Sequence, residues 1–516
     1  MHTKKKPLHG PSALTLPQDL THQWRQRVVS HGKKSLKAFQ KDPDSGSLPI
    51  TQQTLELTRK HKRPIEDLWL IFNRDRQDLV KHYLTSEKAA FHYLLGFHLP
   101  NAARAYGTLL RLEERHPQIV SYLKSLEDSP MTASTKSKPA NQSQKHPKTE
   151  EPASKEIRPS DDIKRPVYWS DYGCGTGAMA QAAAYWLRRH LKKNPLHVDL
   201  TDLGKHLLTC AHDLIASDPK LQPAVVTTRR FGLEALHVGR DRGDLRPAPA
   251  SREDAGVKPF YGISLGYVWN ELSRNPKARS KILELLNYHQ EQGHETLVLI
   301  VEPATEHQAK AAMSWRDQLT QLGYYPLYPC PTGRGACPMT APGRDWCFGE
   351  FIWKEPVECR QLDSLLGSDR KHLATSSYVF ASPELWKKLQ QGAPEPKKIV
   401  VGRPTFKRDL KKPSPKPESA GSPALTFEYL LCDGKSLSKA PAQSLGSAEL
   451  KNPAGRPGEK TAKGQTRGPL KSPRNLPPHG NTKQPASSSV GEPPRSNESA
   501  GILPYQLRGT TFEKNP

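Results

Sequence analysis

The sequence lacks any apolar run close to the roughly 20 residues that a membrane-spanning helix requires, so it predicts no membrane partner. It also lacks the apolar segment that a secretory signal would place after Lys4, Lys5 and Lys6. Its seven cysteines, in a chain without such a signal, favour thiols or metal ligands over a disulfide framework. These absences argue against both a membrane protein and a disulfide-stabilised secreted one.

Hydrophobic residues are also scarce, at 35% of the 516 residues, and 48 prolines interrupt the chain. Such a polar chain cannot bury all of its length in a core, so we expect long disordered segments. The net charge of +25 at pH 7 favours a polyanionic partner, whose affinity falls as salt rises. Nucleic acid is the polyanion we expect; basic tails that only aid solubility are the alternative.

The composition divides the chain into five parts. Apolar residues at helical spacing predict a basic helical domain over 1–127. The Ser-, Pro-, Lys- and Gln-rich residues 128–162 predict a flexible linker. Between 163 and 390, short apolar segments alternate with helical ones, which indicates an α/β domain with a mostly parallel sheet. Residues 396–435 predict a small β-like extension, and residues 436–516 a disordered basic tail.

Individual elements follow from the same patterns. In the helical domain, Pro100 is expected to end one helix and Asn101 to begin the next. The expected strands of the α/β domain are 167–170, 196–200, 224–228, 262–267 and 296–301. The expected helices are 178–191, 203–216, 275–290 and 306–322. In the extension, residues 399–401 are expected to pair with 425–432.

A glycine-rich loop joins the first expected strand to the next helix. Asp171 precedes three glycines, Gly173, Gly175 and Gly177, in the spacing G-x-G-x-G. A strand, a glycine loop and a helix bring a ligand against backbone amides, and glycine permits the close approach. Dinucleotide sites usually have G-x-G-x-x-G, so this loop instead resembles the first motif of class I S-adenosylmethionine (SAM) methyltransferases. An ordinary strand-to-helix turn is the alternative.

Polar residues after neighbouring strands would complete a pocket for that cofactor, because ligands bind beyond the carboxyl ends of parallel strands. Asp202 lies about 25 residues past the loop, where a carboxylate can accept hydrogen bonds from both ribose hydroxyls. We prefer it to Asp199 because a helix follows it directly, although either acid could instead be a helix cap. Asn270 and Glu271 follow the fourth expected strand and would lie over the pocket.

Three cysteines, Cys330, Cys337 and Cys347, lie close together in a Gly- and Pro-rich loop with few apolar residues. Metal–thiolate bonds could order such a loop, because metal-binding free energy then becomes folding free energy. Cys432 is the preferred fourth ligand, and Cys359 is its rival. Four cysteines without a clear histidine fit either zinc or a [4Fe–4S] cluster. Ordinary buried or surface thiols are the alternative.

Together these motifs resemble a methyltransferase-like family associated with the small ribosomal subunit, best known from mitochondrial assembly factors and with relatives in bacteria. The resemblance covers residues 60–435. It is carried by the segments 93–106, 171–177, 266–272, 299–303 and the cysteine loop 328–348. It implies a class I SAM-methyltransferase-like (Rossmann-like) α/β fold, a [4Fe–4S] cluster on the four cysteines and binding to small-subunit rRNA during assembly.

The chain departs from the family pattern in several places. Phe348 stands where a histidine often follows the third cysteine. The linker lengthens a usually short connection, and the segment 403–424 and the tail are additions. The additions leave the C-terminal boundary, and with it the role of Cys432, open.

No catalytic set is recognisable. Amino methylation of bases often uses a proline-containing loop after the fourth strand, but residues 269–272 have no proline. Cytosine methylation needs a cysteine nucleophile at that strand end, whereas Cys330 follows the fifth strand among expected metal ligands. We therefore expect a monomeric rRNA-binding assembly or maturation factor, with SAM as its candidate cofactor, in the bacterial cytoplasm or, alternatively, the mitochondrial matrix. The other hypotheses are an active SAM-dependent rRNA methyltransferase and a redox-sensing RNA-binding protein.

Overall fold

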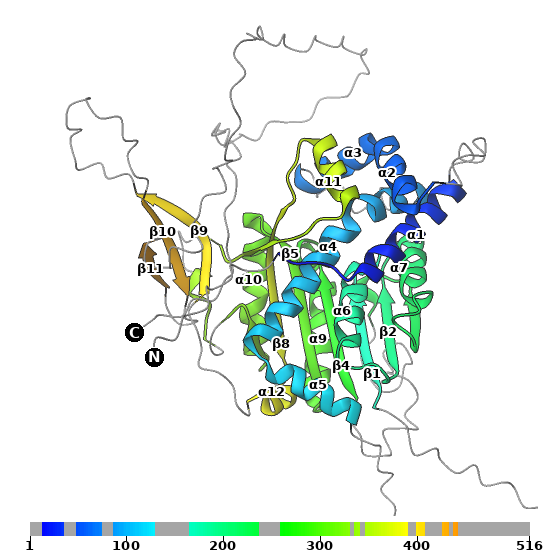
Figure 1. The fold of residues 1–516 in the computed structure, drawn as a ribbon. Helices are drawn as coiled ribbons and strands as arrows, with labels where there is room; N and C mark the ends of the chain where they lie inside the picture. The colour runs from blue at the N-terminus through cyan, green and yellow to red at the C-terminus, as the bar shows by residue number, and fades with distance from the viewer. Residues whose placement is uncertain are drawn as a thin grey trace, which may run out of the picture.

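The computed structural model describes ten segments of the chain, and the expected linker and most of the expected tail lie outside them. The described residues are 13–35, 48–74, 86–128, 165–236, 259–330, 335–340, 346–390, 399–407, 426–432 and 437–441. They form an α/β domain with N-terminal helices packed on it, and a small second sheet (Figure 1). None of the helices in these segments is both long and apolar enough to cross a bilayer.

The main sheet has the strand order of a class I methyltransferase fold. Its strands are β1 (Val167–Tyr172), β2 (Leu196–Thr201), β3 (Ala224–Arg229), β4 (Phe260–Gly266), β5 (Glu295–Pro303), β6 (Tyr325–Tyr328), β7 (Gly349–Ile352) and β8 (His372–Ala381). The order is β3-β2-β1-β4-β5-β8-β6, and β7 also pairs with β8. The first five strands are parallel, whereas β8 runs antiparallel to its neighbours β5, β6 and β7. The expected α/β fold is confirmed, with a mixed sheet.

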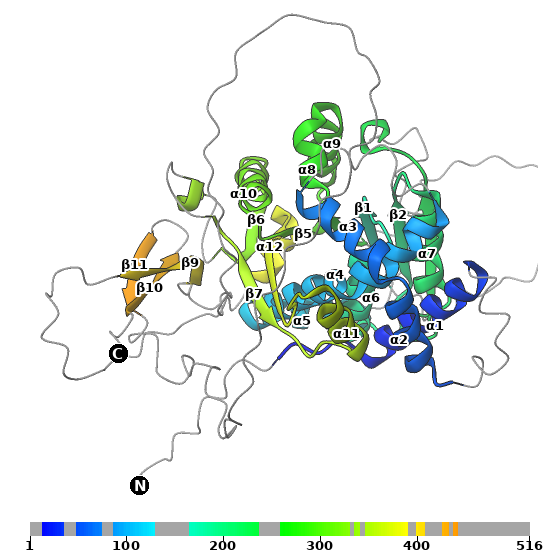
Figure 2. The same cartoon turned by 90° about the horizontal axis from the view of Figure 1, so that it is seen from above.

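Helices cover both faces of this sheet, as Figure 2 shows from above. Within the domain they are α6 (Ala178–Arg188), α7 (Lys205–Ala216), α8 (Trp269–Arg274), α9 (Pro276–Glu291), α10 (Glu306–Gln321), α11 (Val357–Leu366) and α12 (Pro383–Leu389), with 3-10 turns at Leu233–Ala235 and Pro338–Thr340. The face under α6 buries Trp169 and Trp186, and the face under α9 and α10 buries Ile263 and Leu286. Each such side chain stabilises the fold by about 1.5–3 kcal/mol.

Five helices precede the sheet in the chain: α1 (Gln18–Ser35), α2 (Ile50–Lys60), α3 (Lys62–Arg74), α4 (Glu87–Arg115) and α5 (Gln118–Asp128). The longest, α4, crosses the face of the sheet that α6 covers (Figure 1). It begins at Ser86, whose side chain accepts a hydrogen bond from the backbone N–H of Ala89. Its residues Phe91, Leu95 and Leu99 are buried in the same core as α6. The N-terminal helices are therefore part of the domain core.

Pro100 lies inside α4 and does not end it, so the expected helix boundary at this residue was wrong. A proline has no N–H to donate, which leaves the carbonyl of the residue four positions earlier, Gly96, without its helical partner. The side chain of Arg370 donates to that carbonyl oxygen at 2.8 Å. A tertiary contact from a distant part of the chain thus offsets the local cost of the proline.

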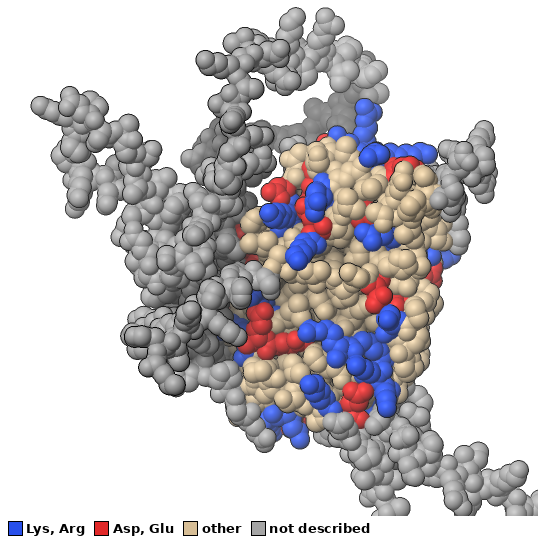
Figure 3. All heavy atoms as spheres, in the orientation of Figure 1, with Lys and Arg blue, Asp and Glu red and all other residues tan. Residues whose placement is uncertain are grey.

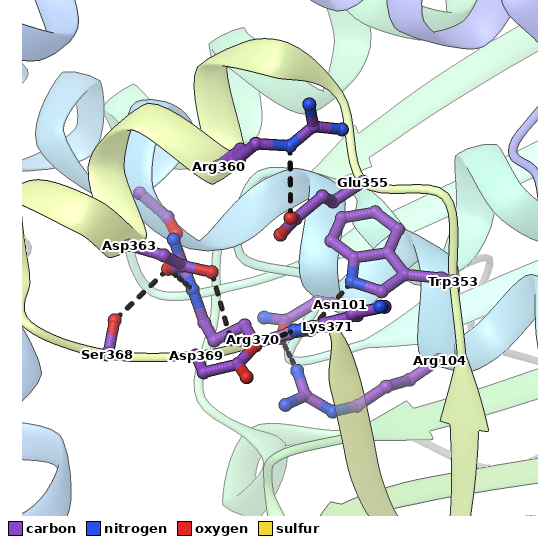
Figure 4. A network of polar contacts seen from close by, with 11 residues as sticks. Asn101, Arg104, Trp353, Glu355, Arg360, Asp363, Ser368, Asp369, Arg370 and Lys371 are labelled. Atoms are coloured by element: carbon purple, nitrogen blue, oxygen red, sulfur yellow. Dashed lines mark hydrogen bonds and ion pairs between the residues drawn. The ribbon is translucent and has the colours of Figure 1, made fainter. Parts of the chain in front are cut away.

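Arg370 is itself fixed by a polar network that joins α11 and β7 to the start of β8 (Figure 4). Its Nε is hydrogen-bonded to the carboxylate of Asp363, whose other oxygen accepts from the Arg370 backbone N–H at 3.0 Å. The indole of Trp353 donates to the Arg370 carbonyl at 2.7 Å. The network holds the segment between β7 and β8 against α4.

The second sheet is antiparallel and has the order β11-β10-β9. Its strands are β9 (Ile399–Lys407), β10 (Thr426–Cys432) and β11 (Leu437–Pro441). Cys432 pairs with Ile399 and Leu431 pairs with Val400, which confirms the expected pairing of these two segments. β11 falls in the range expected to be disordered, so that expectation was wrong for these five residues, whose backbone pairs with β10.

Candidate cofactor and cysteine sites

The glycine loop leaves β1 and enters α6 in a conformation that side chains rarely adopt. Gly173, Gly175 and Gly177 have φ values of +70°, +54° and +77°. At Gly173 a Cβ atom would lie 2.2 Å from Cγ1 of Val268, so packing also excludes a side chain there. At Gly175 the nearest atom to such a Cβ would be 3.6 Å away, which is ordinary contact. The backbone is thus least obstructed at the middle of the loop.

Asp171 supports the glycine loop through two hydrogen bonds. Its side chain is fully buried and accepts hydrogen bonds from the Ser264 hydroxyl at 2.7 Å and from the Ala180 backbone N–H at 3.1 Å. Burial raises the pKa of this carboxyl to about 7, against the opposing effect of these hydrogen bonds. The carboxyl therefore ties α6 to β4, which is a supporting position beneath the predicted cofactor site.

Asp202 lies beside the loop, as expected from its place after β2. Its Oδ2 accepts from the Gly175 backbone N–H at 2.9 Å, and its Oδ1 accepts from the Gly204 N–H at 2.7 Å. Burial raises the pKa of Asp202 above its ordinary value. The Leu203 backbone N–H also bonds to this carboxylate, which can accept about four hydrogen bonds in all and so keeps room for another donor. Asp199, the alternative, lies instead near Thr227 and Arg229.

Residues of helix α4 contact the glycine loop, and the sequence did not predict this contact. The buried ring of His98 is hydrogen-bonded through Nδ1 to the Thr176 hydroxyl at 3.0 Å and through Nε2 to Oε1 of Gln181 at 2.9 Å. Burial lowers the pKa of His98 to about 4. The ring of Tyr93 is the group that a Cβ on Gly175 would meet first, at 3.6 Å. These residues are nearly 80 positions apart in the chain, so no local pattern reveals the contact.

A polar and aromatic row continues along α4 from the glycine loop toward β8. Tyr93 stacks on Phe97 with ring centroids 5.3 Å apart, and the Asn101 amide donates to the Tyr93 hydroxyl at 3.4 Å. Arg104 donates to the Asn101 oxygen at 3.3 Å and to the Ala374 carbonyl at 3.1 Å. The row connects the glycine loop with the antiparallel strand of the sheet.

The other residues expected near the cofactor belong to α8. This helix begins at Trp269, whose backbone N–H donates to Oε1 of the buried Glu302 at 3.1 Å. Asn270 and Glu271 occupy the next two positions of α8, and their side chains lie outside the described part of the structure. Their predicted contacts with a cofactor stay a prediction.

The four preferred cysteines come together in the core beneath α10. Cys337, Cys347 and Cys432 are buried there, and the half-buried Cys330 packs against them. Burial raises the pKa of Cys347, and the nearby thiols of Cys337, Cys330 and Cys432 raise it further. The rival, Cys359, is buried in the core on the other face of the sheet, beside Arg370 and Asp363. Cys432, and not Cys359, therefore lies in the same core as the cysteine loop, near Cys347.

This group comes from two parts of the chain, the loop between β6 and β7 and the end of β10. Cys330 follows β6, Cys337 and Cys347 precede β7, and Cys432 ends β10. Among the described residues, no set of three or more His, Cys, Asp or Glu side chains has the arrangement that a metal ion needs.

Neighbouring elements hold the backbone of the cysteine loop. The Cys337 N–H donates to Oδ1 of Asp317 at 3.0 Å, and the Cys347 N–H donates to the sulfur of Met313 at 3.3 Å. On the other side, the Ser376 hydroxyl donates to the Cys347 carbonyl at 3.0 Å. The loop is thus fixed between α10 and β8.

Basic side chains are spread over the surface. On the face in Figure 3, Lys and Arg occur in several groups with Asp and Glu among them. Exposed basic residues stand at the junction of α2 and α3 and after the end of α6: Arg59, Lys60, Arg63, Arg189, Lys192 and Lys193. Such groups can contact a polyanion, although each alone is also ordinary for a soluble surface.

Comparison with known proteins gives one family. Residues 155–408 match the model of the family described as mitochondrial small ribosomal subunit Rsm22. Among curated protein sequences, none matches the chain significantly.

Solved structures similar to the chain include several methyltransferases. A human methyltransferase 10 domain containing protein is 8% identical, with 55% of this chain and 97% of that chain covered and a TM-score of 0.23. A SAM-dependent methyltransferase from Aquifex aeolicus is 13% identical, with 32% and 75% covered and a TM-score of 0.21. The [4+2]-cyclase SpnF is 12% identical, with 42% and 75% covered and a TM-score of 0.24. TM-scores this low carry no argument, so the fold assignment rests on the strand order of the main sheet alone.

Proposed function

We propose that the chain belongs to the family described as mitochondrial small ribosomal subunit Rsm22, whose model matches residues 155–408, and that it binds small-subunit rRNA during assembly of that subunit. Of the two locations expected from the sequence, the family description supports the mitochondrion. The protein would act there as a binding factor that carries a SAM-type fold and an iron–sulfur cluster.

One observation carries the metal-centre part of this proposal: Cys432, from a distant strand, lies in the same core as the three cysteines of the loop. Chance placement would leave thiols scattered, as Cys174, Cys210 and Cys359 are, each buried elsewhere in the domain. Burial and neighbouring thiols raise the pKa of Cys347 and of Cys337, so each of these two stays a protonated thiol until a metal centre replaces its proton. The gathering therefore supports a shared metal centre more than four separate structural thiols.

The donor set fits a [4Fe–4S] cluster. Such a cluster takes four cysteine thiolates, each bound to a different iron, so the four sulfurs need not converge on one point. Cys330, Cys337, Cys347 and Cys432 would be those ligands, and zinc is the alternative occupant. The bound cluster would supply metal–thiolate bonds that join β10 to the loop before β7. Its binding free energy would contribute directly to the stability of this region.

The glycine loop fits the methionine and ribose parts of SAM. Gly177 precedes α6 without a side-chain cap, so the N-terminus of this helix can bind a ligand's polar groups. Asp202 would accept hydrogen bonds from the ribose hydroxyls with its remaining lone pairs. His98 would fix Thr176, and therefore the loop, in place.

rRNA binding is tested by its salt dependence and its selectivity. Affinity for small-subunit rRNA is measured by filter binding between 50 and 200 mM salt, with an unrelated RNA of equal length as control. We expect affinity for the rRNA to fall by about tenfold or more over this range. Equal affinity for the two RNAs, or an affinity that is insensitive to salt, would contradict the proposal.

A second candidate function is methyl transfer to rRNA, favoured by a complete glycine loop with Asp202 bonded to it. The test is incubation of the protein with labelled SAM and immature small subunits. If the wild-type protein transfers label to rRNA and a Gly175→Val variant does not, the protein is a methyltransferase. Binding of SAM without incorporation would support the binding factor instead.

A further inference from the structure

Two arginines lie near the cysteines, one on α10 and one at the end of α4. We propose that Arg316 and Arg115 provide the counter-charges of the cluster, and so set how firmly it is held and at what potential it is reduced. This inference rests on the proposed function, since it assumes that the four cysteines bind a cluster.

Arg316 lies inside the site. Its side chain is 1% exposed, and it donates to the carbonyl of Gly335 and to the sulfur of Cys330. The same guanidinium is paired with Oδ1 of Asp317 at 2.7 Å, and that oxygen also accepts from the Cys337 N–H. The carboxylate is more exposed, at 23%, so water screens its charge better than the charge of the arginine. A buried cation is therefore held against two of the four cysteines.

Arg115 is the last residue of α4. It donates to the carbonyl of Pro329, directly before Cys330, and interacts electrostatically with Cys330 and Cys432. Because Cys432 ends β10, this arginine stands between the loop and the second sheet. It is placed to attract both of the thiolates that come from different parts of the chain.

Charge balance explains why two cations belong here. An oxidised [4Fe–4S] core with four thiolates has an excess of two negative charges, and reduction adds another. Burying uncompensated charge is expensive, so nearby cations should strengthen binding of the cluster. They also stabilise the more negative, reduced form, which raises the reduction potential. A purely structural role would fix the loop backbone without moving the potential.

The test uses the full chain, purified anaerobically and reconstituted with iron and sulfide. We expect Arg316→Gln and Arg115→Gln to lower the midpoint potential and to weaken retention of iron against a chelator by about tenfold. Arg316→Lys, which keeps the charge, should restore the wild-type potential. Asp317→Asn, which removes the opposing charge, should raise the potential above that of wild type. Arg360→Gln changes an exposed arginine paired with Glu355 and serves as the control.

The outcomes separate the inference from the proposed function. A wild-type chain that takes up no iron would refute the cluster itself. A wild-type cluster with unchanged potential and iron retention in both glutamine variants would refute only the role of the arginines. If Arg316→Gln fails to fold, Arg316→Lys and Asp317→Asn provide the test. We expect a higher midpoint potential in Asp317→Asn than in Arg316→Lys, and equal potentials in these two variants would overturn the inference.

Discussion

The glycine loop and the cysteine loop are built in opposite ways. Around the glycine loop the chain supplies the partners itself: Asp171 holds α6, Asp202 holds Gly175 and His98 holds Thr176. The cysteine loop instead brings buried thiols together beside a buried arginine that is paired with Asp317. The first site is preorganised by the protein, whereas we propose that the second is completed by a metal centre.

The largest expected effect is the loss of the metal centre from the cysteine site. Cys347→Ser should reduce the iron content of anaerobically purified protein to near zero and destabilise it by more than about 3 kcal/mol, because metal-binding free energy is lost. Iron analysis and denaturant unfolding measure this. Cys359→Ser, in the other core, is the matched control and should keep its iron. Equal iron in the two variants would contradict the assignment of ligands.

The next effect tests preorganisation of the glycine loop. Gly173→Ala should lower the free energy of unfolding by about 3 kcal/mol, because the new Cβ meets Val268 and φ is +70°. Gly335→Ala in the cysteine loop has nothing within 4 Å of its Cβ and should be almost neutral. Urea unfolding of both variants checks this contrast; a neutral Gly173→Ala would show that the loop is not rigid.

The pH dependence of stability should report on His98. Its pKa is about 4 in the folded protein and about 6.5 unfolded, so the unfolded chain binds more protons between these values. His98 therefore costs stability as the pH falls from about 6.5 to 4, by about 1.4 kcal/mol per unit at most. The raised pKa of Asp171 acts in the opposite direction over the same range.

A His98→Gln variant isolates this contribution. Its free energy of unfolding should rise less steeply with pH between 4.5 and 6.5 than that of wild type. Urea unfolding at several pH values measures the slopes. Identical slopes would mean that the ring is not held neutral against Thr176 and Gln181.

The smallest effect concerns Asp202 alone. Asp202→Asn replaces one acceptor oxygen by a donor, so affinity for SAM should fall by about tenfold while iron content stays at the wild-type level. Asp199→Asn, beside Arg229, should leave SAM affinity unchanged. Calorimetric titration measures both. Loss of affinity in the Asp199 variant alone would reverse the assignment.

Much of the fold could be predicted from local patterns. Five parallel strands, the helices between them and the pairing of β9 with β10 follow from apolar periodicity and turn residues. The continuation of α4 through Pro100 could not be predicted, because the compensating donor is Arg370, far away in the chain. The antiparallel strand β8 was missed for a similar reason: its neighbours are set by tertiary pairing.

The sites were predictable in their motifs and less so in their surroundings. The glycine spacing located the loop, and the need for a fourth thiolate beside the three of the cysteine loop suggested Cys432, whose role as a ligand stays a prediction. The supporting position of Asp171, the cover by His98 and Tyr93 and the two arginines depend on contacts between distant segments. A single sequence does not encode such contacts at any recognisable spacing.

The most direct test of the central claim is metal and sulfide analysis of the anaerobically purified protein, together with its visible absorption spectrum. The account predicts a brown protein with about four iron and four sulfide per chain and a broad band near 400 nm, lost in Cys347→Ser. A colourless protein that contains zinc, or no metal at all, would contradict it.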